Sequence, residues 1–160
     1  MPHSVWLDST VWHEHNCIQR DEVAAGEYAG RTLAEAGYRK WIYMDRPDTS
    51  RSYYCAAGRR AGVMAAADQA KANLRIVCHD LEEELGSEFM QRLTPRIRLI
   101  LGNPYFISEV VRAAMRARRC AGKDFALVCV DEGFTTAGYS WEALSHVRFP
   151  ASRWGCAPRR

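Results

Sequence analysis

The sequence predicts an α/β fold, with a mostly parallel sheet that has helices on both of its faces. Short apolar runs alternate with longer amphipathic or alanine-rich segments, and polar loop signals separate them along the chain. Buried parallel strands are typically short, continuous apolar runs, and helices connect them. The alternation therefore indicates βαβ units with right-handed crossovers.

The first half of the chain shows this alternation from its beginning. The apolar run Val5–Leu7 predicts a strand, and residues 9–19 are polar and irregular. The acidic pair Asp21-Glu22 favours a helix start, because negative charge stabilises the amino end of a helix. Gly37 is expected to end this helix. The remaining elements of this half are a buried strand at 41–44, a loop at 45–52 and a helix at about 53–71.

The second half continues the same pattern. Asn103-Pro104 favours the start of a helix that runs to about residue 118, because asparagine is a good cap and proline is tolerated at the first helical position. The run Phe125–Val130 predicts the last clear strand, which Asp131 ends. The other expected elements are a strand at 74–78, a loop at 79–81, a helix at 82–93, a strand at 97–101 and a weak strand at 144–149.

The composition favours one globular domain in the cytoplasm. The chain has 160 residues, with 48% apolar and 26% charged residues, which is enough for a real core. A net charge of +3 is too small to indicate nucleic-acid binding. The sequence has no apolar run long enough to span a membrane, and its first residues lack the features of a signal peptide. The six cysteines are scattered without paired spacing, which favours reduced thiols.

Three polar residues stand where an open parallel sheet binds ligands, at the carboxyl ends of its strands. Arg59 lies on the helix that follows the loop at 45–52, and Asp131 follows a buried strand. For Arg59 the alternative is a helix-surface arginine, as expected of Arg60. For Asp131 the alternative is a loop cap. Asn103 is equally compatible with ligand binding and with capping the next helix.

Catalytic and metal sites are not expected. His13-x-His15-x-Cys17 brings three potential metal ligands together, but a polar surface loop is the preferred interpretation, because a zinc site usually needs a fourth ligand. Asp80 with Glu82–Glu84 is better explained as a solvated helix start. The sequence also lacks the Gly-x-Ser-x-Gly motif of many hydrolases. We expect neither an enzyme nor a cofactor.

Taken together, seven segments between Val5 and Pro150 resemble the effector-binding domain of the LacI/GalR family of transcriptional regulators, which is related to periplasmic sugar-binding proteins. The segments occur in the family's order. Arg59–Gly62, for example, is similar to the family's Arg-x-x-Gly helix, and 124–132 resembles its strand that ends in Asp-Asp. The segments are 5–8, 21–42, 59–62, 79–86, Asn103, 124–132 and 144–150.

The resemblance implies a lobe of the type I periplasmic-binding-protein fold. The family's domain has two lobes joined by crossing strands, and it is nearly twice as long as this chain. The resemblance therefore implies a truncated effector domain without the family's DNA-binding headpiece. The implied division is 1–46 for part of the first lobe, 47–139 for the effector-binding second lobe, 140–150 for a crossing strand and 151–160 for a tail.

The resemblance also implies a ligand and its contacts. The implied ligand is a sugar or a related small polar molecule, bound by Arg59, Asn103 and Asp131. The arginine fork would donate to adjacent hydroxyls, and the carboxylate would accept from them. Leu81 stands where the family often has an aromatic residue that stacks on the sugar. Other implied properties are a homodimer, no membrane partner, and DNA contact only through the absent headpiece.

Two alternatives stay open at this point. The first is a solute-binding protein of a sugar transporter, which predicts a signal peptide. The second is a remnant that binds no ligand and mainly dimerises.

Overall fold

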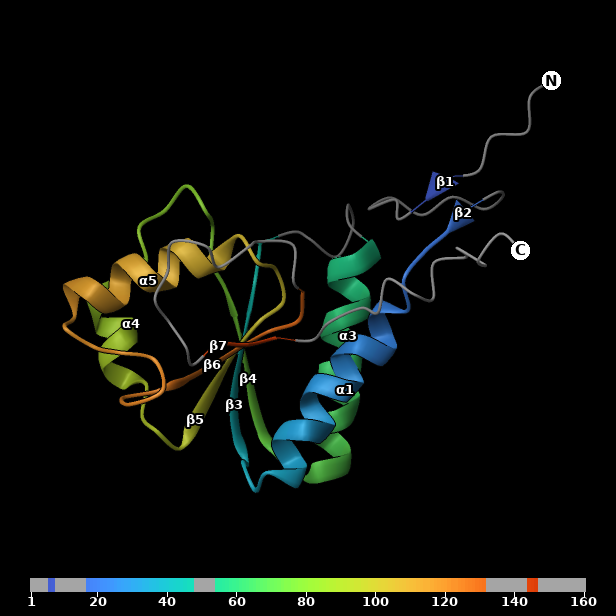
Figure 1. The fold of residues 1–160 in the computed structure, drawn as a ribbon, viewed down its shortest axis with the longest axis horizontal. Coiled ribbons are helices and arrows are strands. Elements are labelled where there is room, and N and C mark those ends of the chain that lie inside the picture. Colours follow the sequence, from blue (N-terminus) through green and yellow to red (C-terminus); the bar gives the residue numbers. More distant parts are fainter. Residues whose placement is uncertain (1–5, 8–16, 48–53, 132–143, 147–160) are drawn as a thin grey trace, which may run out of the picture.

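The centre of the molecule is a five-stranded parallel sheet (Figure 1). The structure is a computed structural model that describes residues 6–7, 17–47, 54–131 and 144–146. The sheet has the order β4-β3-β5-β6-β7, and every neighbouring pair is parallel, as the sequence predicts. The strands are β3 (Lys40–Asp45), β4 (Asn73–Cys78), β5 (Ile97–Leu101), β6 (Ala126–Cys129) and β7 (Leu144–His146).

Helices cover both faces of this sheet, which confirms the predicted layers (Figure 1). Side chains alternate between the faces along each strand. Trp41 and Tyr43 of β3 therefore enter one core, whereas Met44 enters the other. The helices of the first core are α1 (Glu22–Glu35) and α3 (Tyr54–Ala70), and those of the second core are α4 (Ser87–Arg92) and α5 (Phe106–Arg116).

The carboxyl ends of the central strands meet at one edge of the sheet. Asp45 is the last residue of β3, Gly102 follows β5, and Asp131 comes two residues after β6. Backbone hydrogen bonds hold this edge, with the nitrogen of Gly102 donating to Met44 and that of Val130 donating to Leu101. In α/β proteins this edge is where ligands bind.

Helix α1 has a defined start and end. The Oδ1 atom of Asp21 accepts a hydrogen bond from the backbone nitrogen of Ala24 at 2.9 Å, which caps the first turn. At the other end Gly37 has φ of 84°, a left-handed conformation that favours glycine. The chain can thus reverse direction there, and the nitrogen of Tyr38 donates back to the carbonyl of Leu33 at 3.0 Å.

Helix α4 is shorter than the sequence predicts. The expected helix starts at residue 82, but α4 starts at Ser87. The side chain of Asp80 accepts from the backbone nitrogen of Glu82 at 3.1 Å, and its carbonyl accepts from that of Glu83 at 3.1 Å. These bonds fold residues 80–83 into a turn, because a short aspartate side chain competes with helical hydrogen bonding.

A second, smaller sheet pairs β1 (Trp6–Leu7) with β2 (Cys17–Ile18) in parallel. The sequence predicts β1, but it places β2 inside the irregular stretch 9–19. A strand of two residues is too short to show the alternation that identifies strands.

Some predictions fall outside the described residues, namely those on His13, His15, most of the loop at 45–52 and the tail 151–160. The predicted lobe boundary between residues 46 and 47 falls between β3 and α3. Side chains of both elements share one buried cluster, together with Ala29 of α1. The division into two lobes stays a prediction.

Candidate ligand-binding site

Glycines allow α1 and α3 to pack unusually closely. A Cβ atom at Gly62 would lie 2.1 Å from the carbonyl oxygen of Val23, and one at Gly26 would lie 2.2 Å from that of Arg59. Any larger residue at either position would therefore force the helix backbones apart. This close approach brings the first turn of α1, which begins with Glu22, against the second turn of α3.

Arg59, on that turn of α3, is buried and bound by protein groups on several sides. Its side chain is 3% exposed, and that of Glu22 is 2% exposed. The Nε and Nη2 atoms donate to the two carboxylate oxygens of Glu22 at 2.6 and 3.0 Å, and Nη1 donates to the carbonyl of Gly102 at 2.9 Å. A bidentate arginine–carboxylate pair is among the stronger polar contacts in proteins. The guanidinium group that is expected from the sequence to bind sugar hydroxyls is thus paired with Glu22.

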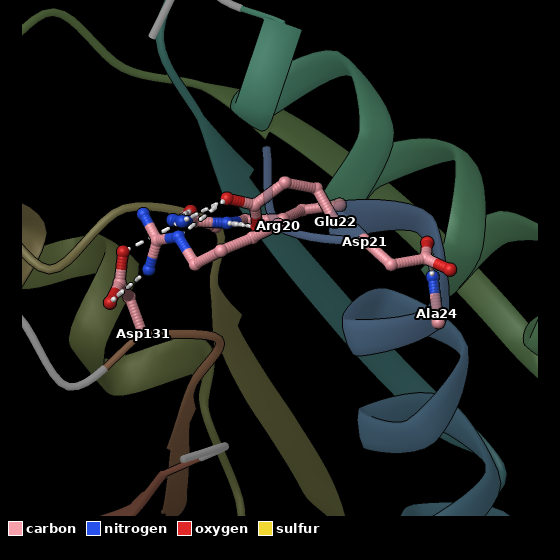
Figure 2. Close-up of polar contacts among 7 residues, drawn as sticks. Arg20, Asp21, Glu22, Ala24 and Asp131 are labelled. Carbon is pink, nitrogen blue, oxygen red and sulfur yellow. Dashed lines mark hydrogen bonds and ion pairs between the residues drawn. The ribbon is translucent and has the colours of Figure 1, made fainter. Parts of the chain in front are cut away.

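Asp131 lies beside this pair, at the end of β6. Its Oδ2 atom accepts from Nη2 of Arg59 at 2.7 Å, and its Oδ1 atom accepts from Nη1 of Arg20 at 3.3 Å. Arg20 also lies 3.4 Å from a carboxylate oxygen of Glu22. Figure 2 shows the Arg20 side chain reaching from the start of α1 to Asp131. We call Arg20, Glu22, Arg59 and Asp131 the ion-pair network.

The network keeps the buried guanidinium charged. Burial alone would lower the pKa of Arg59, but the hydrogen bonds and charge of Glu22, with the charge of Asp131, raise it above its ordinary value. The nearby thiol of Cys129 stays neutral, because burial raises its pKa to about 12. Two arginines and two carboxylates give the network a formal net charge of zero.

Two buried polar atoms near this edge have no hydrogen-bond partner among the described residues. One is the Tyr43 hydroxyl, which lies so close to Gly102 that a Cβ there would be 2.1 Å from it. Burial raises the pKa of Tyr43 well above its ordinary value, so the hydroxyl keeps its proton. The other is Nε2 of His79, whose ring tilts against Phe106 with ring centroids 6.4 Å apart.

Asn103 follows Gly102 directly and so stands next to a partner of Arg59. Its Oδ1 atom accepts from the backbone nitrogen of Tyr105 at 2.9 Å. That bond shapes the turn before α5, which begins at Phe106 and not at the proline. The sequence offers helix capping as the alternative to ligand binding for Asn103, but the residue that precedes α5 is Tyr105, and the amide oxygen of Asn103 forms a turn one step earlier.

Leu81 lies in a different environment. It is partly buried and packs against the core of α4 and α5, on the face of the sheet opposite α3. It also lines a depression of about 260 Å³ between the loop after β4 and α5, together with charged residues such as Glu84 and Arg116. The structure does not bring Leu81 together with Arg59, and its predicted role as a sugar platform stays a prediction.

Arg60 is not simply a surface residue. Its Nη1 atom donates to Oδ2 of Asp45 at 3.2 Å, and its side chain is 27% exposed. This pair ties α3 to the carboxyl end of β3, one strand away from the ion-pair network.

Sequence reasoning brings Arg59 and Asp131 to one edge, but it misses Arg20 and Glu22. The acidic residue at the start of α1 is explained from the sequence by the helix dipole alone. Gly26 on α1 and Gly62 on α3 are the sequence signal that could have indicated a close contact of the two helices, and so could have placed Glu22 near Arg59.

Neither a metal site nor a membrane span is found in the described part of the chain. Residues 17–47 and 54–131 contain no group of three or more histidine, cysteine, aspartate or glutamate side chains placed to hold a metal ion. Of the helices that the structure describes, none has the length and apolar character needed to cross a bilayer.

Comparison with known proteins identifies the fold through structure rather than sequence. No protein-family model matches the sequence, and no curated protein matches it. A transcription regulator-like protein of Staphylococcus haemolyticus superposes with a TM-score of 0.72 at 12% identity, over 89% of this chain. A LacI family transcriptional regulator of Enterococcus faecium with bound ribose gives 0.71 at 14% identity, over 90%. A periplasmic binding protein/LacI transcriptional regulator of Alkaliphilus metalliredigens with D-xylulofuranose gives 0.69 at 15%, over 84%.

These similarities establish the fold. The chain spans about half the length of these structures, 51%, 55% and 51% respectively. The chain therefore has the α/β fold found in LacI-type regulators, and the predicted fold class is confirmed.

Proposed function

We propose that this chain is the effector-binding part of a LacI-type transcriptional regulator, and that it binds a small neutral polyhydroxyl ligand without catalysing a reaction. The observation that carries the proposal is the meeting of Arg59 and Asp131 at the carboxyl edge of the parallel sheet, 2.7 Å apart. Arg59 and Asp131 are 72 residues apart in the sequence. Paired charged groups at this edge are suited to donate to and accept from ligand hydroxyls.

The charge of the site favours a neutral ligand. The ion-pair network is already balanced, so an anion or a cation would add an uncompensated charge next to buried groups, which is costly. A hydroxyl group can donate to Asp131 and accept from an arginine at the same time. Sugars bound by the structurally similar regulators of Enterococcus faecium and Alkaliphilus metalliredigens have this chemistry.

In this proposal Asp131 is the main acceptor, and Arg59 contacts the ligand through the edge of its guanidinium that faces Asp131. Asn103 and Leu81 are secondary candidates, because one is engaged in a turn and the other packs in the opposite core. The proposal further places the protein in the cytoplasm as a homodimer and assigns DNA recognition to a headpiece outside these 160 residues. The lobe division at residues 46/47 belongs to the same proposal.

A sugar panel on the full chain tests the proposal. D-ribose, D-xylose, D-glucose and D-galactose are titrated by calorimetry, with the wild type and Asp131→Asn compared. We expect at least one sugar to bind, and Asp131→Asn to weaken it by about 1–3 kcal/mol, because a charged hydrogen-bond partner is lost. Wild-type protein that binds none of the panel, or an Asp131→Asn variant that binds as tightly as wild type, would contradict the proposal.

The second candidate is a domain that binds no ligand and dimerises. One observation favours it: Nε, Nη1 and Nη2 of Arg59 all donate to protein groups, so a ligand must compete with bonds already made. Failure of every sugar in the panel, together with a stable dimer, would support this candidate.

A further inference from the structure

The ion-pair network has an inner and an outer arginine. The side chain of Arg59 is 3% exposed, whereas that of Arg20 is 18% exposed and that of Asp131 is 12% exposed. A molecule that approaches this edge from solvent therefore meets Arg20 and Asp131, with Arg59 behind them.

The ion-pair distances also indicate that Arg59 is held more tightly than Arg20. Arg59 lies 2.6 Å from Glu22 and 2.7 Å from Asp131, in the range of strong charge-assisted hydrogen bonds. Arg20 lies 3.4 and 3.3 Å from the same two carboxylates. Longer and more exposed pairs are weaker, because water screens them. A ligand hydroxyl can replace these two contacts of Arg20 at lower cost than the contacts of Arg59 with the same carboxylates.

The backbone holds Arg20 in place for such a contact. The carbonyl of Arg20 accepts from the nitrogen of Glu22 at 3.0 Å, and the next residue, Asp21, caps α1 through Ala24. The side chain thus leaves from a fixed point at the helix start, and Figure 2 shows it pointing away from the cap towards Asp131. A side chain anchored in this way loses less entropy when a ligand binds.

We infer that Arg20 is a ligand-binding residue of this site and determines its specificity for neutral ligands with adjacent hydroxyl groups. The guanidinium of Arg20 donates to one hydroxyl, and Oδ1 of Asp131 accepts from its neighbour. Arg59, which Glu22 fixes, lies behind them and also holds Asp131 in position. This inference rests on the proposed function, since it concerns the contacts of the same ligand.

The test compares D-ribose with 2-deoxy-D-ribose, which lacks one hydroxyl of an adjacent pair. Both sugars are titrated by calorimetry into the full-length wild type, Arg20→Gln, Arg20→Lys and Arg31→Gln. Arg31 is a matched control, because it is an exposed arginine on α1 whose guanidinium stacks on Tyr28 at 5.7 Å, outside the network. Circular dichroism and thermal unfolding without sugar report whether each variant is folded.

We expect Arg20→Gln to weaken ribose binding about tenfold, the loss of a charged hydrogen bond, and Arg31→Gln to change it by less than about twofold. Arg20→Lys should weaken it by an intermediate factor, because an ammonium group cannot reproduce the fork. The wild-type preference for ribose over 2-deoxyribose should shrink in Arg20→Gln. If Arg20→Gln is unfolded, the preference for ribose over 2-deoxyribose is compared between the wild type and Arg20→Lys instead.

Each other outcome contradicts the inference in a recognisable way. Ribose binding that is unchanged in Arg20→Gln would overturn it and leave the proposed function intact. Equal weakening of both sugars would assign Arg20 a purely structural role in holding Asp131. If the wild-type protein binds neither of these two sugars and none of the other sugars in the panel, both the proposed function and this inference are contradicted.

Discussion

The Nε atom of Arg59 and the Oε2 atom of Glu22 lie 2.6 Å apart between α1 and α3, with both side chains almost fully buried. Each of the two charges depends on the other, because a lone ion in the interior has lost its hydration without compensation. The pair therefore stabilises the helix crossing and at the same time fixes the guanidinium that meets Asp131.

Glu22→Gln should destabilise the protein strongly. The substitution leaves the buried guanidinium without its closest carboxylate, and breaking a buried pair on one side costs about 3–5 kcal/mol. The free energy of unfolding from urea titration measures this loss. Glu35→Gln, an exposed site on the same helix, is the control and should change stability by less than about 0.5 kcal/mol.

The double variant Glu22→Gln/Arg59→Gln extends this prediction. Removing both charges should cost less than the sum of the single changes, since neither is then left unpaired. Additive losses would contradict a direct interaction between the two side chains.

Gly62→Ala should destabilise the contact of α1 with α3. Its Cβ would lie 2.1 Å from the carbonyl of Val23 and 2.7 Å from the nitrogen of Glu27, both backbone atoms that cannot turn aside. We expect a loss of about 1–3 kcal/mol, the usual range for overpacking, in thermal or urea unfolding. Gly86→Ala is the matched control, because nothing lies within 4 Å of its Cβ position and its φ of −64° suits alanine. Equal effects of the two substitutions would argue against close helix packing.

Stability should fall in alkaline solution, partly through Cys129. Burial raises the pKa of this thiol from 9.0 to about 12 in the folded protein. Above pH 9 the unfolded chain therefore loses this proton while the folded chain keeps it, and stability decreases as pH rises towards 12. Cys129→Ala should reduce the slope by up to about 1.4 kcal/mol per pH unit in urea unfolding between pH 9 and 11. Cys120→Ala, at an exposed thiol, is the control for the loss of a cysteine side chain.

The free edge of β4 should support self-association. β4 is the terminal strand of the sheet, and among the described residues no strand lies beyond it. Ile76 on this strand is 38% exposed, and an exposed apolar edge can pair with another chain. We expect a dimer by light scattering at micromolar concentration, weakened by Ile76→Lys. Met115→Lys on α5, at a 71% exposed site, should leave the dimer intact. A wild-type monomer would contradict this prediction.

The layered fold was accessible from the sequence because its signals are local. The strands β3, β5 and β6 are mostly apolar runs, and Gly37 marks a helix end that one residue can encode. The start of α4 was not predictable in this way. At residues 80–83 the chain could form either a helix or a turn. The hydrogen bond from Glu82 to the Asp80 side chain favours the turn, and the composition of this segment does not reveal that preference.

The candidate site was predictable only where topology determines it. Arg59 and Asp131 meet because both follow parallel strands that end at one edge. The part played by Glu22 depends on how closely α1 approaches α3, which is a tertiary property set by Gly26 and Gly62. Arg20 was missed for a related reason, since its partner Asp131 lies 111 residues away in the sequence.

The sequence separation within the ion-pair network also has a consequence during synthesis of the chain. Glu22 precedes Arg59 by 37 residues, whereas Asp131 follows it by 72. At ordinary elongation speeds, Asp131 is added roughly 4–14 s after Arg59. During that interval a nascent chain can already close α1 on α3 around the first carboxylate, but the guanidinium still lacks the second. The emergence of Asp131 from the ribosome is therefore the event that completes the charge balance of this edge.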